Sequence, residues 1–271
     1  MVVQSTGASP PLPDLSRVPQ HVAVIMDGNG RWAESRGLSR DDGHRAGAEN
    51  LRAIIERFAE HGVAVLTLWA FSTENWGRPR REVDALMRLG AEYIDHHLGE
   101  LDSLGVRVRH IGDLEGVPVA LRRRIKRAVE RTSHNQRITV NLAFNYGGRA
   151  DIVGAVRRLI AMGTKPEEVT EDAISAQLAA ADLPDPDLVI RAGGENRVSN
   201  FLIWQAAYAE YYFTPTLWPE FDVEDVDEAL MQYSSRNRRF GTVSGETVSG
   251  ETVPSESGPS EPGDATLNGS A

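Results

Sequence analysis

Short runs of β-branched and other apolar residues alternate along the chain with segments in which apolar positions recur at helical spacing. This alternation is typical of a parallel β-sheet covered by helices. The apolar runs predict strands at residues 21–26, 63–71, 106–111, 138–145 and 187–191, with a short one at 211–213. The helical spacing predicts helices at residues 46–60, 81–104, 118–132, 150–162, 171–180 and 223–238. No repeat divides this region, so we expect a single α/β domain.

The two ends of the chain differ in composition from this region. Residues 1–19 are rich in Ser, Pro and Gly, and residues 242–271 contain a direct repeat of Thr-Val-Ser-Gly-Glu followed by three prolines. Segments of this composition cannot bury enough apolar surface to fold. We therefore expect a flexible arm at 1–19, one folded domain at 20–241 and a disordered acidic tail at 242–271.

Composition limits the chemistry that the chain can perform. Among its 271 residues, 41% are apolar, which is enough for a core of ordinary size, and none is cysteine. The lack of cysteine excludes disulfide scaffolds, thiol nucleophiles and cysteine-ligated metal sites. The longest nearly apolar run, residues 63–71, is far shorter than the roughly 20 residues that cross a bilayer. We expect a cytoplasmic protein with no transmembrane segment.

The distribution of charge argues against a nucleic-acid partner. The net charge is −10, and the tail at 242–271 carries half of it, because it has five acidic residues and no basic one. The rest of the chain lacks the basic surplus of a nucleic-acid-binding protein. Among the 29 basic residues only Lys126 and Lys165 are lysine. The arginine excess fits either GC-rich codon usage or the forked recognition of phosphate by guanidinium groups.

The first predicted strand ends in a glycine-rich loop, and ligands of open α/β sheets bind at this edge. Residues 27–32 read Asp-Gly-Asn-Gly-Arg-Trp. Glycine amides and Arg31 can hold a phosphate, and Asp27 can hold a magnesium ion against it. The same residues are common in tight turns. They also match a dinucleotide fingerprint, but that motif requires an acidic residue at the end of the next strand, about 20 residues on.

Two further strand ends and one aromatic segment carry polar residues. Residues 71–79 suit an anionic, partly apolar ligand, or a capped loop before the next helix. Residues 191–200 hold two arginines and a serine around glycines, which suits a second anion site or a solvated turn. Glu210 lies in an apolar and aromatic stretch, where an unpaired carboxylate is unfavourable, so it needs a metal ion or an arginine partner.

Taken in order, these segments resemble the motifs of cis-prenyltransferases. The resemblance rests on residues 21–32, 43–47, 71–76, 145–149, 191–200, 208–211 and 238–241. It implies a mostly parallel central sheet surrounded by helices, with an apolar tunnel, in each subunit of a homodimer. It also implies repeated condensation of isopentenyl diphosphate onto an allylic diphosphate such as farnesyl diphosphate, with Mg²⁺ as the cofactor. The bacterial members that make an undecaprenyl or decaprenyl lipid-carrier precursor resemble this chain most.

The resemblance also implies roles for individual residues. Asp27 and Asn75 would be catalytic, and Asp27 and Glu210 would contact the metal. The other expected substrate contacts lie in the same segments: Gly28, Asn29, Gly30, Arg31, Trp32, Arg40, His44, Ser72, Thr73, Glu74, Trp76, Arg78, Arg191, Arg197, Val198, Ser199, Arg239 and Gly241. The segment at 191–199 would hold isopentenyl diphosphate, and Arg239 and Gly241 would reach the partner subunit's site.

Other functions are compatible with parts of the sequence. A short- or medium-chain cis-prenyl diphosphate synthase would share the motifs, although the small Ala70 before Phe71 resembles the long-chain members. A non-catalytic partner subunit would be expected to lose charged site residues, which this chain retains. A dinucleotide-binding module would bind a nucleotide in a titration. A lipid product implies a transient membrane contact for its release.

Overall fold

The computed structural model describes residues 10–236. They contain a six-stranded sheet of order β3-β4-β2-β1-β5-β6, in which every neighbouring pair is parallel. The strands are β1 (His21–Ile25), β2 (Val65–Ser72), β3 (Val106–Ile111), β4 (Ile138–Tyr146), β5 (Leu188–Arg191) and β6 (Glu210–Phe213). The expected α/β fold with a parallel central sheet is confirmed.

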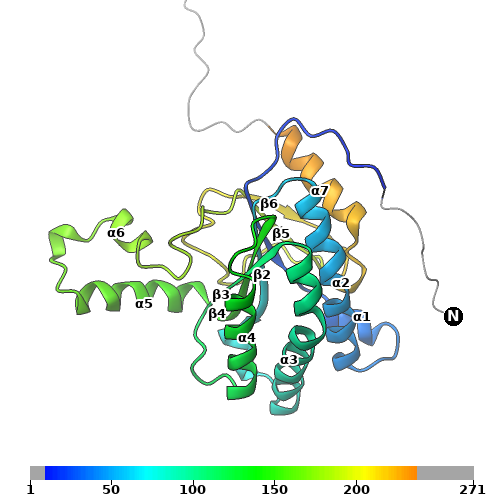
Figure 1. The fold of residues 1–271 in the computed structure, drawn as a ribbon, viewed down its shortest axis with the longest axis horizontal. Coiled ribbons are helices and arrows are strands. Elements are labelled where there is room, and N and C mark those ends of the chain that lie inside the picture. The colour runs from blue at the N-terminus through cyan, green and yellow to red at the C-terminus, as the bar shows by residue number, and fades with distance from the viewer. Residues whose placement is uncertain (1–9, 237–271) are drawn as a thin grey trace, which may run out of the picture. The chain divides into compact units, whose positions relative to one another are not determined.

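Four helices lie on one face of this sheet (Figure 1). They are α2 (Arg40–Glu60), α3 (Arg80–Ser103), α4 (Val119–Arg131) and α7 (Val223–Ser235). Helix α2 packs against α3 and α7, and α3 packs against α4. The connections from β1 through α2 to β2 and from β2 through α3 to β3 both move toward the β3 edge of the sheet. The connection from β3 through α4 to β4 moves back in the other direction with its helix on the same face. Its hand is therefore opposite to that of the other two, which makes it the rare left-handed kind.

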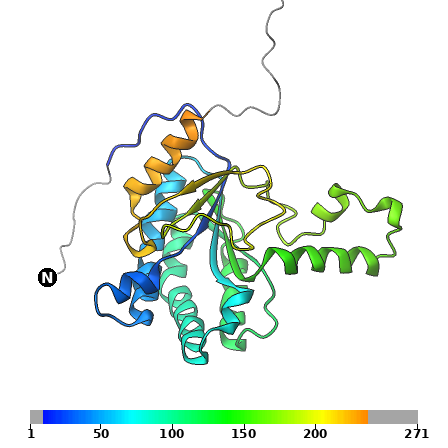
Figure 2. The same ribbon diagram turned by 180° about the vertical axis from the view of Figure 1, so that it is seen from behind.

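The opposite face is covered largely by irregular chain (Figure 2). There Phe201, Leu202 and Ala206 pack against Ala23 and Ile25 of β1. The remaining elements are α1 (Asn29–Glu34), η1 (Thr73–Gly77), α5 (Gly148–Ala161), η2 (Pro166–Glu168), α6 (Glu171–Ser175) and η3 (Trp218–Glu220).

Helix α6 ends earlier than the predicted residues 171–180. Arg158 donates to the carbonyl of Gln177, and the carboxylate of Asp151 accepts from the amide of Ala179. These tertiary hydrogen bonds take backbone groups that a longer helix would use, so the last predicted turns do not form.

Residues 10–19 form no helix or strand, yet they contact the domain. Leu15 packs against the main apolar core, and the guanidinium of Arg57 donates to the carbonyl of Pro10. Arg17 donates to Glu210 at 2.7 Å. The rest of the expected arm, residues 1–9, and the expected tail at 242–271 lie outside the described residues.

His21, in β1, is a buried histidine that should make stability depend on pH. Its ring nitrogens lie 2.7 Å from Oγ1 of Thr67 and 2.6 Å from the carbonyl of Pro184. Burial lowers the pKa of His21 from 6.5 to about 4. Between these values the unfolded chain binds a proton that the folded chain does not. The free energy of unfolding contributed by this group should therefore fall by about 3 kcal/mol as the pH drops from 7 to 4.

Chemical denaturation of the wild type and of His21→Asn across this pH range checks the expectation. The variant should lose less stability than the wild type on acidification, because asparagine does not titrate. Parallel pH profiles for the two proteins would contradict the assignment.

Candidate active site

The loop after β1 places Asp27 at the carboxyl edge of the sheet. Its Oδ1 accepts from the amide of Gly28 at 2.7 Å, and its Oδ2 accepts from Nη2 of Arg191 at 2.9 Å. Nη2 of Arg31, in α1, lies 3.3 Å from Oδ1. Gly28 has a φ of +106°, and a Cβ there would lie 2.8 Å from Leu217, so the turn requires glycine. The carboxylate is thus held between two guanidinium groups.

The loop after β5 touches the first loop. Gly193 has a φ of +91°, and a Cβ there would lie 2.8 Å from Nη2 of Arg31. The buried Arg191 donates from Nη1 to Oγ of Ser199 at 2.8 Å and to the carbonyl of Arg197. The two anion loops predicted from the sequence are therefore parts of one cationic site.

Two buried donors of this site have no hydrogen-bond partner among the described residues. They are Nε of Arg191 and Nε1 of Trp32. A buried donor without an acceptor is unfavourable by about 1–3 kcal/mol, and by more when it is charged. The side chain of Arg197 is largely exposed and pairs with Glu195.

The loop after β2 is a single 3₁₀ turn, η1, fixed by its own side chains. Oδ1 of Asn75 accepts from the amide of Ser72 at 3.0 Å, and Oγ of Ser72 accepts from the amide of Glu74 at 3.1 Å. Oγ1 of Thr73 donates to Glu74 at 3.0 Å. Nε1 of Trp76 donates to Asn145, which tethers the loop to the end of β4. Each of these expected site residues therefore helps to shape the loop.

Asn200 joins this loop to the loop after β5, and the sequence analysis did not single it out. Its Nδ2 donates to Oε1 of Glu74 at 2.7 Å, and its Oδ1 accepts from the amide of Arg149 at 2.8 Å. Burial alone would raise the pKa of Glu74, but the hydrogen bonds from Asn200 and Ser72 lower it below its ordinary value. Glu74 is therefore ionised and joins the two loops.

Glu82, in the first turn of α3, is the second residue that the sequence analysis missed. Its carboxylate lies 2.8 Å from Nη1 of Arg78, 3.6 Å from Nε2 of His44 and 3.8 Å from Nη1 of Arg40. Burial opposes its ionisation, but Arg78 and Arg40 lower its pKa below the ordinary value. Burial, followed by the charge of Arg78, lowers the pKa of His44, so His44 is neutral at neutral pH.

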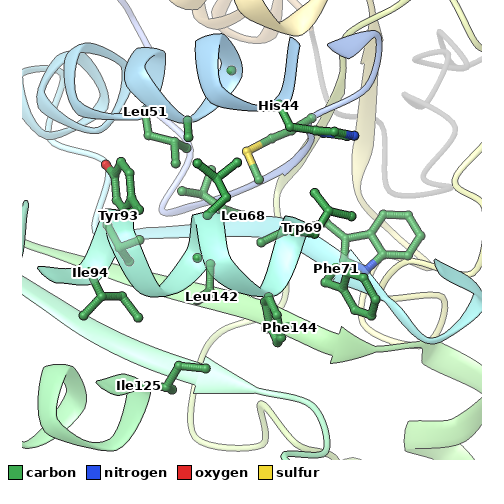
Figure 3. A pocket seen from close by; sticks show the side chains of 18 of the residues that line it. His44, Leu51, Leu68, Trp69, Phe71, Tyr93, Ile94, Ile125, Leu142 and Phe144 are labelled. Atoms are coloured by element: carbon green, nitrogen blue, oxygen red, sulfur yellow. The ribbon is translucent and has the colours of Figure 1, made fainter. Parts of the chain in front are cut away.

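An apolar cavity begins beside His44 and runs between the sheet and helices α2, α3 and α4 (Figure 3). With its open mouth it encloses about 1220 Å³. Leu68, Leu142 and Ile125 are among the residues of β2, β4 and α4 that line it. The apolar tunnel that the family resemblance implies is thus present.

Ala70 occupies an irregular position in the wall of this cavity. Trp69 pairs with Ala143 and Phe71 pairs with Phe144, so a bulge leaves Ala70 unpaired in the ladder. Its side chain lines the cavity. The size of this residue therefore affects the space available near the cationic site.

Asp27 and Glu210, the two expected metal contacts, lie at opposite ends of β5 within one chain. Glu210 begins β6 opposite Leu188, whereas Asp27 contacts Arg191 at the far end of the parallel strand β5. The carboxylate of Glu210 instead contacts Arg17 at 2.7 Å and Arg236 at 3.5 Å. Of the two partners left open by the sequence, arginine is the one observed. Within residues 10–236, no three His, Asp or Glu side chains form a metal-binding group.

Comparison with known proteins decides the family. Residues 25–241 match the family model described as "Putative undecaprenyl diphosphate synthase". The chain belongs to this prenyltransferase family. It is 50% identical over 234 residues to an isoprenyl transferase of Heliobacterium mobile, covering 85% of this chain and 90% of that one. It is also 49% identical over 246 residues to a farnesyl-diphosphate-specific ditrans,polycis-undecaprenyl-diphosphate synthase of Xanthomonas oryzae pv. oryzae. That match covers 89% of this chain and 95% of that one.

Solved structures show the same prenyltransferase fold. Lavandulyl diphosphate synthase from Lavandula x intermedia, in complex with dimethylallyl diphosphate, aligns with a TM-score of 0.80 and 39% identity over 83% of this chain and 99% of that one. A "probable undecaprenyl diphosphate synthase" from Campylobacter jejuni aligns with a TM-score of 0.70 and 34% identity. This alignment covers 82% of this chain and 98% of that one. Within residues 10–236, no helix of this prenyltransferase is long and apolar enough to cross a membrane.

Proposed function

We propose that this chain is a magnesium-dependent cis-prenyltransferase that adds isopentenyl diphosphate repeatedly to farnesyl diphosphate. Its product would be a long-chain polyprenyl diphosphate, the undecaprenyl or decaprenyl lipid-carrier precursor. One observation carries this proposal: a long apolar cavity opens beside a site in which two cationic loops touch. The names of the most similar relatives support the same substrate and product.

The two loops divide the substrates between them. The loop at 27–31, with Arg40, His44 and Arg78, would hold the allylic diphosphate, and the loop at 191–199 would hold isopentenyl diphosphate. During condensation the bond between the allylic carbon and the diphosphate oxygen breaks, a carbon–carbon bond forms, and a proton leaves. Preorganised guanidinium groups and amides stabilise the charge that develops on the departing diphosphate. Nδ2 of Asn75 has no hydrogen bond among the described residues, so it would be able to donate to substrate.

The donor set at Asp27 fits a magnesium ion shared with substrate. Its carboxylate is about one-third exposed and lies beside the guanidinium groups of Arg31 and Arg191, which suit phosphate. Mg²⁺ is usually bound through one or two carboxylates together with phosphate oxygens and water. The ion would add positive charge next to the leaving diphosphate. A metal contact by Glu210 would require a second subunit.

An exposed apolar face on α5 supports the proposed homodimer. Val153, Val156 and Ile160 share one side of this helix, and Ile160 is 71% exposed. Helix α5 extends away from the layer of α2, α3 and α4 (Figure 1). Contiguous exposed apolar positions of this kind are typical of protein interfaces. We expect the full chain to be a dimer, and its mass in sedimentation equilibrium checks the oligomeric state. We expect the protein to be cytoplasmic.

Replacing Arg197 by alanine should raise the Michaelis constant for isopentenyl diphosphate by about 10- to 150-fold. The side chain of Arg197 is largely exposed on the loop after β5. Its loss would therefore remove a charge-assisted contact with isopentenyl diphosphate and have little effect on packing. Steady-state kinetics with each substrate varied in turn measure the effect. Arg31→Ala is the matched variant and should act mainly on farnesyl diphosphate. Equal effects of Arg197→Ala on both substrates would show that the two sites are misassigned.

Shortening the chain after Gly241 should preserve activity, whereas shortening it before Arg239 should abolish activity. Both residues lie outside the described residues, but the family match extends through residue 241. We propose that Arg239 and Gly241 complete the partner subunit's site. Activity assays and melting temperatures of the two shortened chains test this, and identical behaviour would contradict it.

Incubation with farnesyl diphosphate, labelled isopentenyl diphosphate and magnesium, followed by product sizing, tests the proposed function directly. Products of about ten or eleven isoprene units are expected. Products that stop after a few additions would indicate the short-chain alternative. Absence of any condensation by the folded chain would indicate a non-catalytic subunit.

A further inference from the structure

Helix α4 has two basic sides that differ in their partners. Six of its 13 residues are arginine or lysine, and Glu130 is its one acidic residue. On the side that faces α3, Asp95 accepts from Arg124 at 2.7 Å and from Arg127 at 3.0 Å. Arg131 donates to Asp102, also in α3, at 2.9 Å. The basic residues on this side are therefore largely neutralised.

The outward side of α4 keeps a net positive charge, although the exposed Glu130 also lies on it. Three basic residues of α4 on this side, together with one arginine of the edge strand β3, form no ion pair within residues 10–236. We call these four residues the basic face: Arg122, Arg123 and Lys126 of α4, and Arg107 of β3. Val119, half exposed, lies at the start of α4 on the same side. A cationic surface with an apolar residue beside it thus stands out on a chain of net charge −10.

This surface lies directly outside the wall of the apolar cavity. A groove open to solvent, of about 940 Å³ with its open mouth, runs between β3 and α4, and Arg107 and Lys126 are among the residues that line it. Val108 and Ile125 line both this groove and the apolar cavity. In Figure 1, α4 stands beside α3 in the layer of helices that covers this face of the sheet. The basic face is therefore separated from the product cavity by single side chains.

We propose that the basic face docks the enzyme onto the surface of an anionic lipid bilayer. Four unpaired cations complement a surface of phosphate headgroups, and each cation near such a surface contributes about a fivefold gain in affinity. Docking here would set the wall of the cavity that holds the lipid product against the membrane that must receive it. Docking requires no substrate, so it goes beyond the proposed reaction. A failure of docking would leave the proposed reaction standing, and a failure of the reaction would leave docking standing.

A bilayer fits this surface better than a nucleic acid does. The residues that line the groove include no Trp, Tyr or Phe on which bases could stack. Arg109, which also lines the groove, is occupied by a two-pronged ion pair with Asp182. What remains is a groove with apolar residues, one carboxylate at Glu130 and a surplus of unpaired cations around it, which suits a surface of anionic headgroups.

Sedimentation of the full chain with lipid vesicles, in the absence of substrates, tests the proposal. The wild type should bind vesicles containing about 30% phosphatidylglycerol, should not bind pure phosphatidylcholine, and should be released by about 0.5 M salt. Combined Arg122→Gln, Arg123→Gln and Lys126→Gln replacements remove three cations and should weaken binding by about 100-fold. Replacement of the same three residues by glutamate also adds negative charge, so it should weaken binding by more than about 100-fold, and circular dichroism confirms that each variant is folded.

The matched control reverses three exposed basic residues elsewhere: Arg81→Glu, Arg88→Glu and Lys165→Glu. It changes the net charge equally, and it should lose less than about tenfold in affinity because these residues lie outside the basic face. Both triple-glutamate variants should be assayed for product in detergent, where the basic-face variant should keep wild-type activity. Failure of the wild type to bind anionic vesicles, equal loss in the control, or tighter binding to a DNA duplex than to vesicles would each overturn the proposal.

Discussion

Replacing Asp27 by alanine should reduce turnover by about 100-fold or more. The carboxylate is the acidic group at the point where the two cationic loops meet, 2.9 Å from Arg191 and 3.3 Å from Arg31. Its loss would remove the proposed metal contact and leave these arginines without the anion that positions them. Because Asp27 lies on a loop and Arg191 keeps its hydrogen bond to Ser199, the fold should persist.

Two variants sharpen this test. Asp27→Asn keeps the size and an acceptor oxygen but removes the negative charge, so it should lose nearly as much activity while melting close to the wild type. Asp41→Ala removes an exposed carboxylate from the first turn of α2 and should stay within about twofold of wild-type activity. Single-turnover rates and magnesium titrations measure the effects. An Asp27→Ala enzyme with more than a tenth of wild-type activity would overturn the assigned role.

Replacing Ala70 by leucine should shorten the product from around ten or eleven isoprene units to markedly fewer. Ala70 sits on the bulge of β2 with its side chain in the cavity wall. Ala70 is exposed, so leucine fits the fold, and its three added carbons extend into the cavity in the path of the growing chain. The neighbours Leu68 and Phe71 are buried and do not yield freely, so a chain that meets the added carbons would overfill this part of the cavity, which is unfavourable by about 1–3 kcal/mol. The first condensations should proceed, and later ones should stall.

Mass analysis of the products, together with initial rates, measures this effect. The expected pattern is a shorter product at a nearly unchanged initial rate, which separates a blocked cavity from a damaged active site. Ala70→Gly removes volume at the same position and should retain the wild-type length distribution. If Ala70→Leu also retains it, or fails to fold, Ala70 does not border the path of the chain.

The starts of the strands and of the helices α3 to α7 could be predicted from the sequence to within two residues, and α2 is the exception. The apolar run at residues 106–111 predicts a strand, and β3 has the same bounds. Helix α2 begins at Arg40, six residues before the predicted start, because the capping box between Ser39 and Asp42 starts it in a polar segment with no apolar period. The short helix α1 lies within a segment that also reads as a glycine turn.

The site could be predicted wherever its residues follow a strand, since parallel strands bring their carboxyl ends to one edge. Glu82 and Asn200 escaped prediction because their roles arise from contacts between distant segments: Glu82 meets Arg40 and His44, and Asn200 meets Glu74. The location of Glu210 depends on strand order, and a sequence with no pairing information does not specify which end of which strand faces Asp27.

The close approach of Gly193 to the loop at 27–31 affects how the enzyme would keep hold of the growing hydrocarbon between additions. In the proposed reaction the allylic substrate loses its own diphosphate, so the lengthened product carries the diphosphate that entered with isopentenyl diphosphate. That group must cross from the second loop to the first before the next addition. Because Gly193 lets the loops touch and Arg191 bridges them through Asp27, the crossing is a short transfer between neighbouring guanidinium groups. The hydrocarbon could then remain in the cavity throughout, so we expect successive additions to be processive.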